Sequence, residues 1–435
     1  LPGIGFVFYL FLGVDLRKRK MFQEKELEDN IHEIIRDQKL LLKDRPDKIR
    51  SDAAEYTDLI MYNMETADAV LLGDIDIFTD GNEKFDALIA DLETAEHFIH
   101  LQYYIIRNDV LFQRIVEVLK KKAAEGVVVR VLFDGMGCRS VRRSYWRQLE
   151  AAGIRTAEFF PAILGRLQLR INYRNHRKIV VIDNRTAYVG GFNIGREYID
   201  LDPRFGHWRD THLRITGEGV LGLQLRFVLD WNYAAGEKLF EDSRLLLVPP
   251  KGERDHCALQ IISSGPDNSL EQIRDNYIRL ITKAKKRICI QTPYFIPDEA
   301  VLNSLLIAVR SGIEVNLMIP CKPDHPFVAT YSYMGELLRA GANCYTYDNG
   351  FLHSKGIIVD GEILCYGTAN MDIRSFALNF EVNAVVYSKK KAEQMEEIFR
   401  EDLKYCTQIT MDSYAARCLK IRFKEQVCRL MSPLL

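Results

Sequence analysis

The sequence carries almost no net charge, because 59 basic and 60 acidic residues leave a formal charge of −1. Proteins that bind duplex nucleic acid usually carry a strong basic excess. The charge balance therefore gives no reason to expect a nucleic-acid partner. The nine cysteines include no C-x-x-C pair, which argues against a zinc or redox centre. Several of them lie in apolar runs, which indicates reduced, buried thiols in a reducing compartment.

Long hydrophobic runs are scarce as well. The chain opens on thirteen largely apolar residues, fewer than the roughly 20 that a membrane-spanning helix needs. Four basic residues follow at 17–20, a pattern typical of the cytoplasmic edge of a span. We therefore predict that residues 1–20 form the end of a longer transmembrane helix. A buried core segment and the remains of a signal peptide are the alternatives, but a signal peptide carries its positive charge before the apolar stretch.

What is present is a chain that repeats itself. Residues 21–65 are charged and helix-prone, and they read as a connector. Beyond them, a buried strand, an amphipathic helix and a second buried strand occur twice, starting from EHFIHLQYY and from KRICIQTPY. Glycine follows the helix each time, at Gly126 and Gly312, as a left-handed cap requires. We predict two α/β halves, residues 66–250 and 251–435, each with its own central sheet and facing each other about a pseudo-twofold axis.

A sharper repeat carries the chemistry. In both halves lysine stands two residues after a histidine, aspartate seven, glycine fourteen and asparagine seventeen. The two sets are His176, Lys178, Asp183 and Asn193 in the first half, and His353, Lys355, Asp360 and Asn370 in the second. A single histidine and lysine with this spacing would usually be an exposed pair without a catalytic function. Two copies in matching context predict a single shared site.

The residue types suit phosphoryl chemistry. Histidine and lysine two apart on a strand point to the same face. Two lysines and two amides, from Asn193 and Asn370, can neutralise and orient the nonbridging oxygens of a phosphodiester. One histidine can attack phosphorus while the other protonates the leaving alcohol. The lysines supply the positive charge that a metal would bring, so we predict neither a metal nor another cofactor.

Each imidazole also needs a carboxylate on its other nitrogen. The downstream strands offer Asp210 and Glu381, at 34 and 28 residues from the histidines of their own halves. We predict that these two carboxylates orient the histidines. The alternative is that they are ordinary surface or strand carboxylates.

These residues resemble the duplicated H-x-K-x4-D motif of the phospholipase D superfamily. The flanking segments are similar to bacterial cardiolipin synthases over residues 70–435, in RNHRKIVVID, GGFNIG, QTPYFIPDE, LHSKGIIVD and GTANMDIRSFALNFEVN. The resemblance implies two tandem phospholipase D-like α/β domains behind a membrane anchor. It implies an enzyme of the bacterial inner membrane, with its catalytic domains on the cytoplasmic side, that condenses two phosphatidylglycerols into cardiolipin and glycerol without a metal.

The resemblance also implies a phosphohistidine intermediate, with His176 as nucleophile and His353 as acid and then base. The residues themselves do not distinguish the two histidines. Asp183 and Asp360 complete the predicted catalytic set, and the family pattern implies that they hold the motif in place.

Other functions use the same residues. A hydrolytic phospholipase D or phosphodiesterase would replace the lipid acceptor by water, and the choice depends on how well the site excludes water. A nuclease of the same superfamily would want a basic groove, which the composition does not favour. An inactive membrane-bound scaffold would not need both motifs intact. The sequence does not indicate an oligomeric state.

Two segments suggest contact with an anionic lipid surface. Apolar residues precede arginines just before the first motif, a pattern that suits insertion at headgroup depth. They are Phe159, Phe160, Ile163 and Leu164, followed by Arg166, Arg170 and Arg174. The C-terminal LKIRFKEQVCRLMSPLL mixes apolar and basic residues in the same way. Ordinary packing against the domain is the alternative for both.

Overall fold

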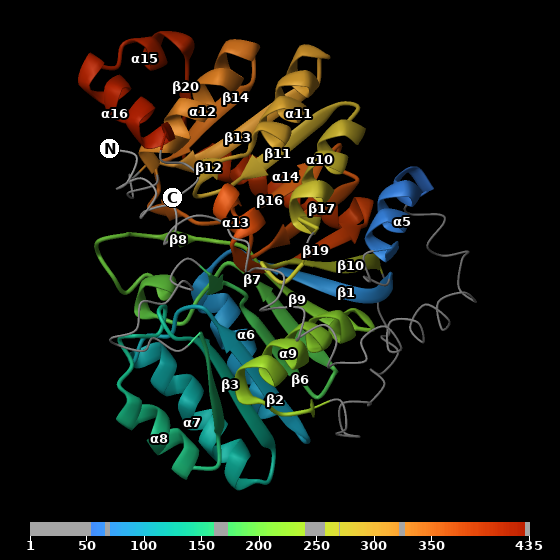
Figure 1. Cartoon of the computed structure of the whole chain (residues 1–435), viewed down its shortest axis with the longest axis vertical. Coiled ribbons are helices and arrows are strands. Elements are labelled where there is room, and N and C mark those ends of the chain that lie inside the picture. Colours follow the sequence, from blue (N-terminus) through green and yellow to red (C-terminus); the bar gives the residue numbers. More distant parts are fainter. Residues whose placement is uncertain are drawn as a thin grey trace, which may run out of the picture.

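Buried runs rich in β-branched residues form the central strands of both halves. The structure is a computed structural model that describes residues 54–65, 70–160, 173–239, 257–268, 270–321 and 327–430. The fold is mixed α/β, with the first half below the second in Figure 1. Strand β6 (Ile179–Ile182) and its counterpart β16 (Gly356–Val359) are buried along their whole length. Strands with no exposed face must be covered by helices on both sides.

The predicted strand–helix–strand units are present in both halves. β2 (Phe98–Tyr103), α7 (Val110–Ala124) and β3 (Val128–Asp134) make the first, and β2 and β3 are parallel. β11 (Arg287–Gln291), α11 (Glu299–Arg310) and β13 (Glu314–Pro320) make the second, also parallel. Asp109 and Asp298 cap the two helices through backbone N–H groups. Gly126 and Gly312 end them with positive φ, which confirms the predicted caps.

The remaining elements complete each half. The first half adds β1 (Leu71–Phe78), α6 (Gly81–Glu93), α8 (Arg143–Ala151), β4 (Arg155–Phe159), β7 (Thr186–Gly190), β9 (His212–Gly217) and α9 (Gly219–Ala235). The second adds β10 (Cys257–Ser264), α10 (Gln272–Lys283), α12 (Phe327–Ala340), β14 (Asn343–Tyr347), β17 (Ile363–Gly367), β19 (Asn379–Tyr387), α14 (Lys389–Leu403), β20 (Cys406–Ile409), α15 (Met411–Ala415) and α16 (Leu419–Leu430).

The two halves share one sheet, so the prediction that each half has its own central sheet is wrong. β1 pairs antiparallel with β10, which joins the halves edge to edge. The strand order reads β20-β14-β13-β11-β16-β17-β19-β10-β1-β9-β7-β6-β2-β3-β4. Counted outward from the β1–β10 junction, equivalent strands of the two halves follow in the same order, and only β20 has no counterpart. A pseudo-twofold axis therefore passes through that junction. Pairing the two open edges satisfies backbone groups that each half would otherwise expose.

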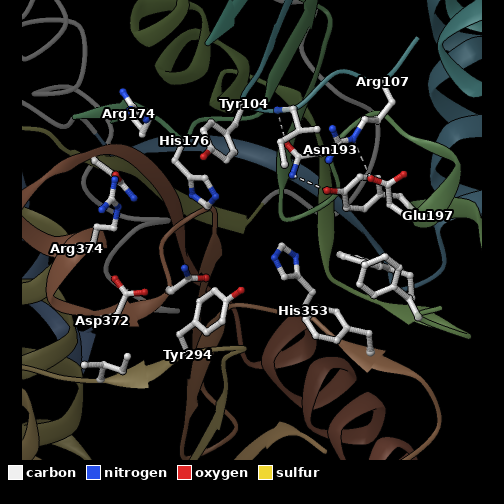
Figure 2. Close-up of a pocket in the computed structure, with 18 residues that line it drawn as sticks. Tyr104, Arg107, Arg174, His176, Asn193, Glu197, Tyr294, His353, Asp372 and Arg374 are labelled. Atoms are coloured by element: carbon white, nitrogen blue, oxygen red, sulfur yellow. Dashed lines mark hydrogen bonds and ion pairs between the residues drawn. The ribbon is translucent and has the colours of Figure 1, made fainter. Parts of the chain in front are cut away.

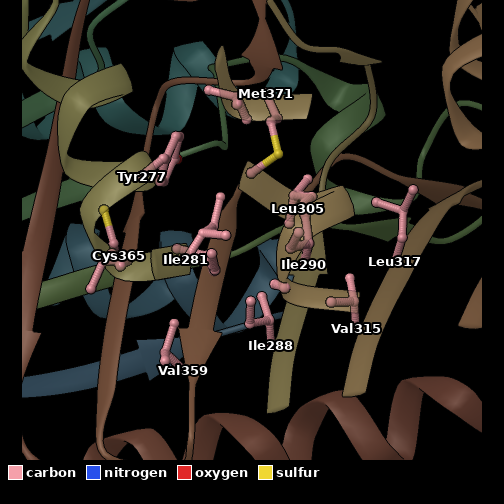
Figure 3. Packing of buried hydrophobic residues seen from close by; sticks show 14 of the residues in the cluster. Tyr277, Ile281, Ile288, Ile290, Leu305, Val315, Leu317, Val359, Cys365 and Met371 are labelled. Carbon is pink, nitrogen blue, oxygen red and sulfur yellow. The ribbon is translucent and has the colours of Figure 1, made fainter. Parts of the chain in front are cut away.

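Side chains fill both faces of this sheet. Figure 3 shows part of the second half's core, where Ile288, Ile290 and Val315 of the sheet pack beneath Leu305 of α11. A further cluster contains residues of both halves, from Leu223 of α9 to Met395 of α14. The halves are therefore joined by a shared core as well as by backbone pairing.

The predicted anchor at residues 1–20 lies outside the described residues, and so does most of the connector. Among the helices that are described, none combines the length and apolar character that crossing a membrane requires. Helix α5 (Thr57–Glu65), at the end of the connector, buries Leu59 and Ile60 in the core of the second half.

The lipid-contact prediction for Phe159 and Phe160 is wrong. Both are buried, at 0% and 7% exposure, in an aromatic cluster with Trp231 and Phe380. Phe159 ends β4 and faces α9, so its ring fills the space between the sheet and that helix. The remaining apolar residues of this segment, Ile163 and Leu164, and the arginines Arg166 and Arg170 lie outside the described residues.

Candidate active site

Two short strands cross between the halves and carry the histidines. β5 (Arg174–Asn175) pairs in parallel with β19 of the second half. In return, β15 (Phe351–Leu352) pairs in parallel with β8 (Trp208–Arg209) of the first half. The pairing continues into the backbone of the motifs. His176 N donates to Phe380 O at 2.9 Å, and His353 N donates to Arg209 O at 2.7 Å.

The orienting carboxylates are exchanged in the same way. His176 Nδ1 lies 2.9 and 3.0 Å from the two carboxylate oxygens of Glu381, and His353 Nδ1 lies 2.6 Å from Asp210 Oδ2. We expected each histidine to use the carboxylate of its own half. The crossing strands explain the difference, because Glu381 directly follows the pairing of β19 with β5. A carboxylate on Nδ1 fixes the tautomer in which Nε2 is free to meet phosphorus.

Both imidazoles favour the neutral form in this environment. Burial lowers the pKa of His353 to about 4, with the charge of Lys355 acting in the same direction and Asp210 opposing it. Burial also lowers the pKa of His176, against the attraction of Glu381. A neutral imidazole is the form that can act as a nucleophile.

The two lysines are buried beside their histidines. Lys178 Nζ donates to His176 O at 2.6 Å, and Lys355 Nζ lies 3.9 Å from Asp210 Oδ2. Burial lowers the pKa of Lys178 to about 7 and that of Lys355 to about 8. An anionic phosphate beside them would favour their charged forms.

The motif aspartates lie elsewhere. Asp183 accepts hydrogen bonds from the backbone N–H groups of residues 96–98, at 2.6 to 2.9 Å. Asp360 accepts from those of residues 285–287, each at 2.8 Å. Both stand at positive φ in tight turns, and neither lines the cavity. Their hydrogen bonds join each motif hairpin to the start of the neighbouring strand, which is a structural function.

A cavity of about 390 Å³ opens over the two histidines. Figure 2 shows His176 and His353 directed toward each other from the two halves. Asn193 and Asn370, the predicted phosphate ligands, both line the cavity. The amide of Asn193 also bonds within its own half, because Oδ1 accepts from Ile105 N at 3.0 Å and Nδ2 donates to Tyr198 Oη at 3.1 Å. Asn370 Oδ1 is buried and has no hydrogen-bond partner among the described residues.

Gly191, the second glycine of the first motif, makes room for an orienting carboxylate rather than for a ligand. A Cβ on Gly191 would stand 1.9 Å from Asp210 Oδ1. The equivalent residue of the second half is Thr368, whose hydroxyl donates to Glu381 Oε2 at 2.6 Å. Only the second half has a hydroxyl directly after the motif glycine, and this hydroxyl, of Thr368, binds the orienting carboxylate.

A buried polar network under each histidine was not predicted. Arg177 donates to both oxygens of Asp230, at 2.7 and 2.8 Å, and Gln102 donates to the same carboxylate. Under His353, Arg209 of the first half and Gln291 of the second both donate to Asp402. The two glutamines, Gln102 and Gln291, occupy equivalent positions in the strand repeat of the sequence. Their partners lie on α9 and α14, where no motif marks them.

One group of described side chains has metal-ligand spacing, and none of its members lines the cavity. It consists of Asp80, Asp200 and His207, with ligand atoms within 4.8 Å of one another. These groups already bind their surroundings. Asp80 caps α6, while Asp200 accepts from Trp208 N and lies 2.7 Å from His207 Nδ1. These contacts give the three side chains a structural role where they stand.

Comparison with known proteins identifies a family. A family model described as cardiolipin synthase, PLD-like domain, matches residues 88–203 and 277–403. The whole chain aligns with a protein named cardiolipin synthase from Listeria welshimeri at 46% identity, over 91% of that protein. It aligns equally well with the major cardiolipin synthase ClsA of Bacillus subtilis, at 46% identity over 91% of that protein.

Solved structures share the fold at low sequence identity. A phosphatidylserine synthase of Haemophilus influenzae superposes with a TM-score of 0.65 at 14% identity, over 84% of this chain and 97% of that one. A polyphosphate kinase of Porphyromonas gingivalis superposes with a TM-score of 0.53 at 15% identity, over 78% of this chain and 49% of that one. These two comparisons support the paired α/β architecture and nothing further.

Proposed function

Since the chain belongs to the cardiolipin synthase family of phospholipase D-like proteins, we propose that it joins two phosphatidylglycerols into cardiolipin and releases glycerol. The observation that carries this proposal is the exchange of carboxylates, since Glu381 orients His176 and Asp210 orients His353 across the interface. Neither half holds a complete site, and the exchange places both imidazoles over one cavity. Two oriented imidazoles on one phosphorus suit a two-step transfer.

In the first step Nε2 of one histidine attacks the phosphorus of a bound phosphatidylglycerol. The second histidine enters this step as an imidazolium, a form that the anionic phosphate beside it favours. The bond from phosphorus to the glycerol oxygen breaks, and Nε2 of the imidazolium gives that oxygen its proton and becomes neutral. In the next step the second histidine takes the proton of the acceptor's primary hydroxyl, whose oxygen attacks phosphorus and releases the first histidine. By family resemblance, His176 is the nucleophile and His353 the acid and then the base. Lys178 and Lys355 neutralise the phosphate oxygens throughout.

We place this reaction at a bacterial cell membrane, with both halves on the cytoplasmic side. The C-terminal helix α16 supports a lipid contact. Its residues Leu419, Phe423 and Val427 share one helix face and are 79%, 72% and 40% exposed. Lys420 and Lys424 lie beside this apolar stripe in the helix register. Apolar side chains with basic neighbours suit the surface of an anionic bilayer.

The position of α16 connects it to the cavity. The helix packs on α12, where Arg429 donates to Glu336 at 2.5 Å and covers the ring of Tyr333 at 4.4 Å. Near its start α12 in turn contacts β12 (Phe295–Ile296), and Ile296 lines the cavity. Helix α16 is thus joined to the wall of the cavity through α12.

Identification of the products tests the proposal. The purified chain is incubated with vesicles of phosphatidylglycerol, and the lipid and soluble products are measured together. Equal amounts of cardiolipin and glycerol are expected, and added glycerol should reduce net cardiolipin formation. The His353→Ala variant is the inactive control. Phosphatidic acid in place of cardiolipin would instead identify a hydrolase that uses water as acceptor.

A further inference from the structure

The two histidines have different neighbours although the fold around them repeats. Two residues before the histidine, the first motif has Arg174 and the second has Phe351. Two residues before the carboxylate that orients it, the first histidine has Asn379 and the second has Trp208. All four side chains line the cavity. The second histidine, His353, is therefore flanked by aromatic rings where the first is flanked by polar side chains.

Three rings form a wall beside His353. The ring centroids of Trp208 and Phe351 lie 5.1 and 5.9 Å from that of its imidazole. The Phe205 ring packs against both, with its centroid 5.1 Å from that of Trp208 and 5.7 Å from that of Phe351. Phe205 also lines the cavity. We call Phe205, Trp208 and Phe351 the aromatic wall.

Phe205 belongs to a segment that lengthens the first half alone. The orienting carboxylate of each half follows the histidine by 34 residues in the first half and by 28 in the second, so the first half has six more. They lie between the short helix η2 (Arg196–Ile199), whose counterpart is α13 (Ile373–Ala377), and strand β8. The insertion, within residues 200–207, thus adds a third ring on the His353 side only.

The insertion is held in place from both halves. Phe205 N donates to Asp202 O at 3.2 Å, and the Asp202 carboxylate is paired with Arg204 at 2.7 Å. At the end of the segment, His207 O accepts from Phe351 N of the second half at 2.8 Å. The backbone that carries the Phe205 ring is therefore fixed relative to the other two rings.

Polar groups next to the aromatic wall bond one another. Tyr198, whose ring centroid lies 4.5 Å from that of Trp208, accepts from Asn193 Nδ2 at 3.1 Å. The neighbouring Glu197 is paired with Arg107 at 3.4 Å (Figure 2). The rings themselves offer a water molecule no strong hydrogen-bond partner, so water is poorly held on this side of the cavity.

We propose that the aromatic wall excludes water from His353, so that the phosphatidyl group passes to a lipid alcohol and not to water. This inference rests on the proposed function, in which His353 is a neutral base once the glycerol has left. A water molecule there would give its proton to the imidazole while its oxygen attacked phosphorus. The bond from phosphorus to His176 would break, and phosphatidic acid would be released.

An acceptor lipid behaves differently at the same place. Its glycerol carbons and the start of its acyl chains gain contact with the rings, which removes apolar surface from water. Its hydroxyl then reaches the base in a space from which bulk water is displaced. Phe205, at the outer side of the aromatic wall, is thus a specificity-determining residue for the acceptor.

The ratio of two products tests the aromatic wall. Each variant acts on phosphatidylglycerol in detergent micelles of fixed composition, and phosphatidic acid and cardiolipin are measured in the same sample. The wild-type chain should form mainly cardiolipin. In Phe205→Ala the ratio of phosphatidic acid to cardiolipin should rise about tenfold, the order of discrimination that one apolar contact supplies. Phe205→Leu keeps a larger apolar side chain and should give an intermediate ratio.

The ratio comes from folded, active molecules alone, so lower stability or a slower rate does not change it. Leu201→Ala is the matched control, because Leu201 belongs to the same insertion, is 56% exposed and is not among the residues that line the cavity. Its ratio should equal that of the wild type. If Phe205→Ala forms no product, Phe205→Leu decides by the same criterion.

Two results would overturn the aromatic wall and leave the proposed function in place. One is an unchanged ratio in the Phe205 variants, and the other is an equal rise in Leu201→Ala. A wild-type chain that forms phosphatidic acid instead of cardiolipin, or neither product, would overturn the proposed function, and the aromatic wall with it.

Discussion

At the level of single residues, the site depends on contacts that each side chain makes across the interface. Glu381 accepts from His176, from Thr368 Oγ1 at 2.6 Å and from Asn379 Nδ2 at 3.2 Å. A carboxylate with this many donors is fixed in position, and it fixes the imidazole in turn. Burial opposes ionisation of Glu381, but His176, Lys178 and the Thr368 hydroxyl hold its pKa below the ordinary value. The histidine is thus oriented by a charged group at neutral pH.

We expect His176→Ala and His353→Ala each to abolish transfer. Attack and protonation occur on one phosphorus, so neither step proceeds when the other imidazole is missing. The double variant should be no slower than either single variant, as residues that act as a unit behave. The rate of cardiolipin formation in vesicles measures this. Substantial activity in either single variant would show that the two histidines do not share a reaction.

Trapping the intermediate would identify the nucleophile. Brief reaction with labelled phosphatidylglycerol followed by acid-free denaturation should leave label on one histidine only. The variant that lacks the other histidine should carry little label, because departure of the glycerol needs the general acid.

The buried lysines predict how catalysis changes with pH. In the empty cavity Lys178, with a pKa lowered to about 7, and Lys355, with a pKa lowered to about 8, lose their protons as pH rises through these values. A bound phosphodiester stays anionic and keeps them charged. Because kcat/KM reports the free enzyme, it should fall between about pH 7 and 9, whereas kcat should change less. Initial rates in micelles with a constant fraction of anionic lipid measure both. A flat kcat/KM over this range would mean that the lysine charges do not assist binding.

Gly191 should tolerate no side chain. The Cβ of Gly191→Ala would stand 1.9 Å from Asp210 Oδ1, so the carboxylate that orients His353 must move. We expect kcat to fall by at least tenfold, since a misplaced catalytic group costs on the order of 10²-fold. Thr368→Ala at the equivalent position only removes a hydrogen bond to Glu381 and should cost less. Equal activity in Gly191→Ala and the wild type would contradict the assigned role of Asp210.

At the level of helices and strands, local pattern predicted most of what the structure shows. The two strand–helix–strand units follow from apolar periodicity, and Asp109, Gly126 and Gly312 mark their helix ends. The β1–β10 junction could not be predicted, because both strands have ordinary edges and their pairing depends on contacts between distant parts of the chain. The crossing strands β5 and β15 have two residues each, too short for any periodicity. The exchange of Asp210 and Glu381 followed from those strands and was missed with them.

The positions of the arginines that line the cavity could not be predicted for the same reason. Arg174 was noted in the sequence only as part of a lipid-contact segment, and the structure places it beside His176 instead. Arg374 belongs to a five-residue helix (α13, Ile373–Ala377) with no motif of its own. Their proximity depends on the two halves being joined, which no local pattern reports.

Helix α16 carries a prediction of its own. Replacing Leu419, Phe423 and Val427 by serine should raise the surface concentration of lipid needed for half-maximal rate, on the order of tenfold, since each side chain loses apolar contact with the bilayer. These side chains are exposed, so the thermal midpoint should stay close to that of the wild type. The exposed Ile307 on α11 gives the control variant Ile307→Ser, which should change neither quantity. An unchanged lipid requirement in the triple variant would show that α16 does not bind the membrane.

At the level of the whole molecule, the shared sheet and shared core bear on how the protein unfolds. Two ordinary domains joined by a linker would unfold separately. Here β1 and β10 pair directly, and one hydrophobic cluster contains residues of both halves. Each histidine also takes its carboxylate from the other half. Loss of either half would leave the other with an open sheet edge, an exposed core face and an incomplete site.

We therefore expect a single cooperative unfolding transition, and the distribution of tryptophan allows a direct test. The three tryptophans, Trp146, Trp208 and Trp231, all lie in the first half. Trp208 also contacts Phe351 and His353 of the second half, so the test uses the Trp208→Phe background, in which the fluorescence reports the first half. Leu305 is fully buried in the core of the second half, and Leu305→Ala should cost about 2–5 kcal/mol of unfolding free energy. If the halves unfold together, the tryptophan-detected midpoint falls in parallel with the loss of helical circular dichroism. Ile307→Ala, on the exposed side of the same helix, should leave both signals in place. A tryptophan midpoint that stays fixed in Leu305→Ala while the helical signal splits into two steps would show that the common sheet does not couple the halves.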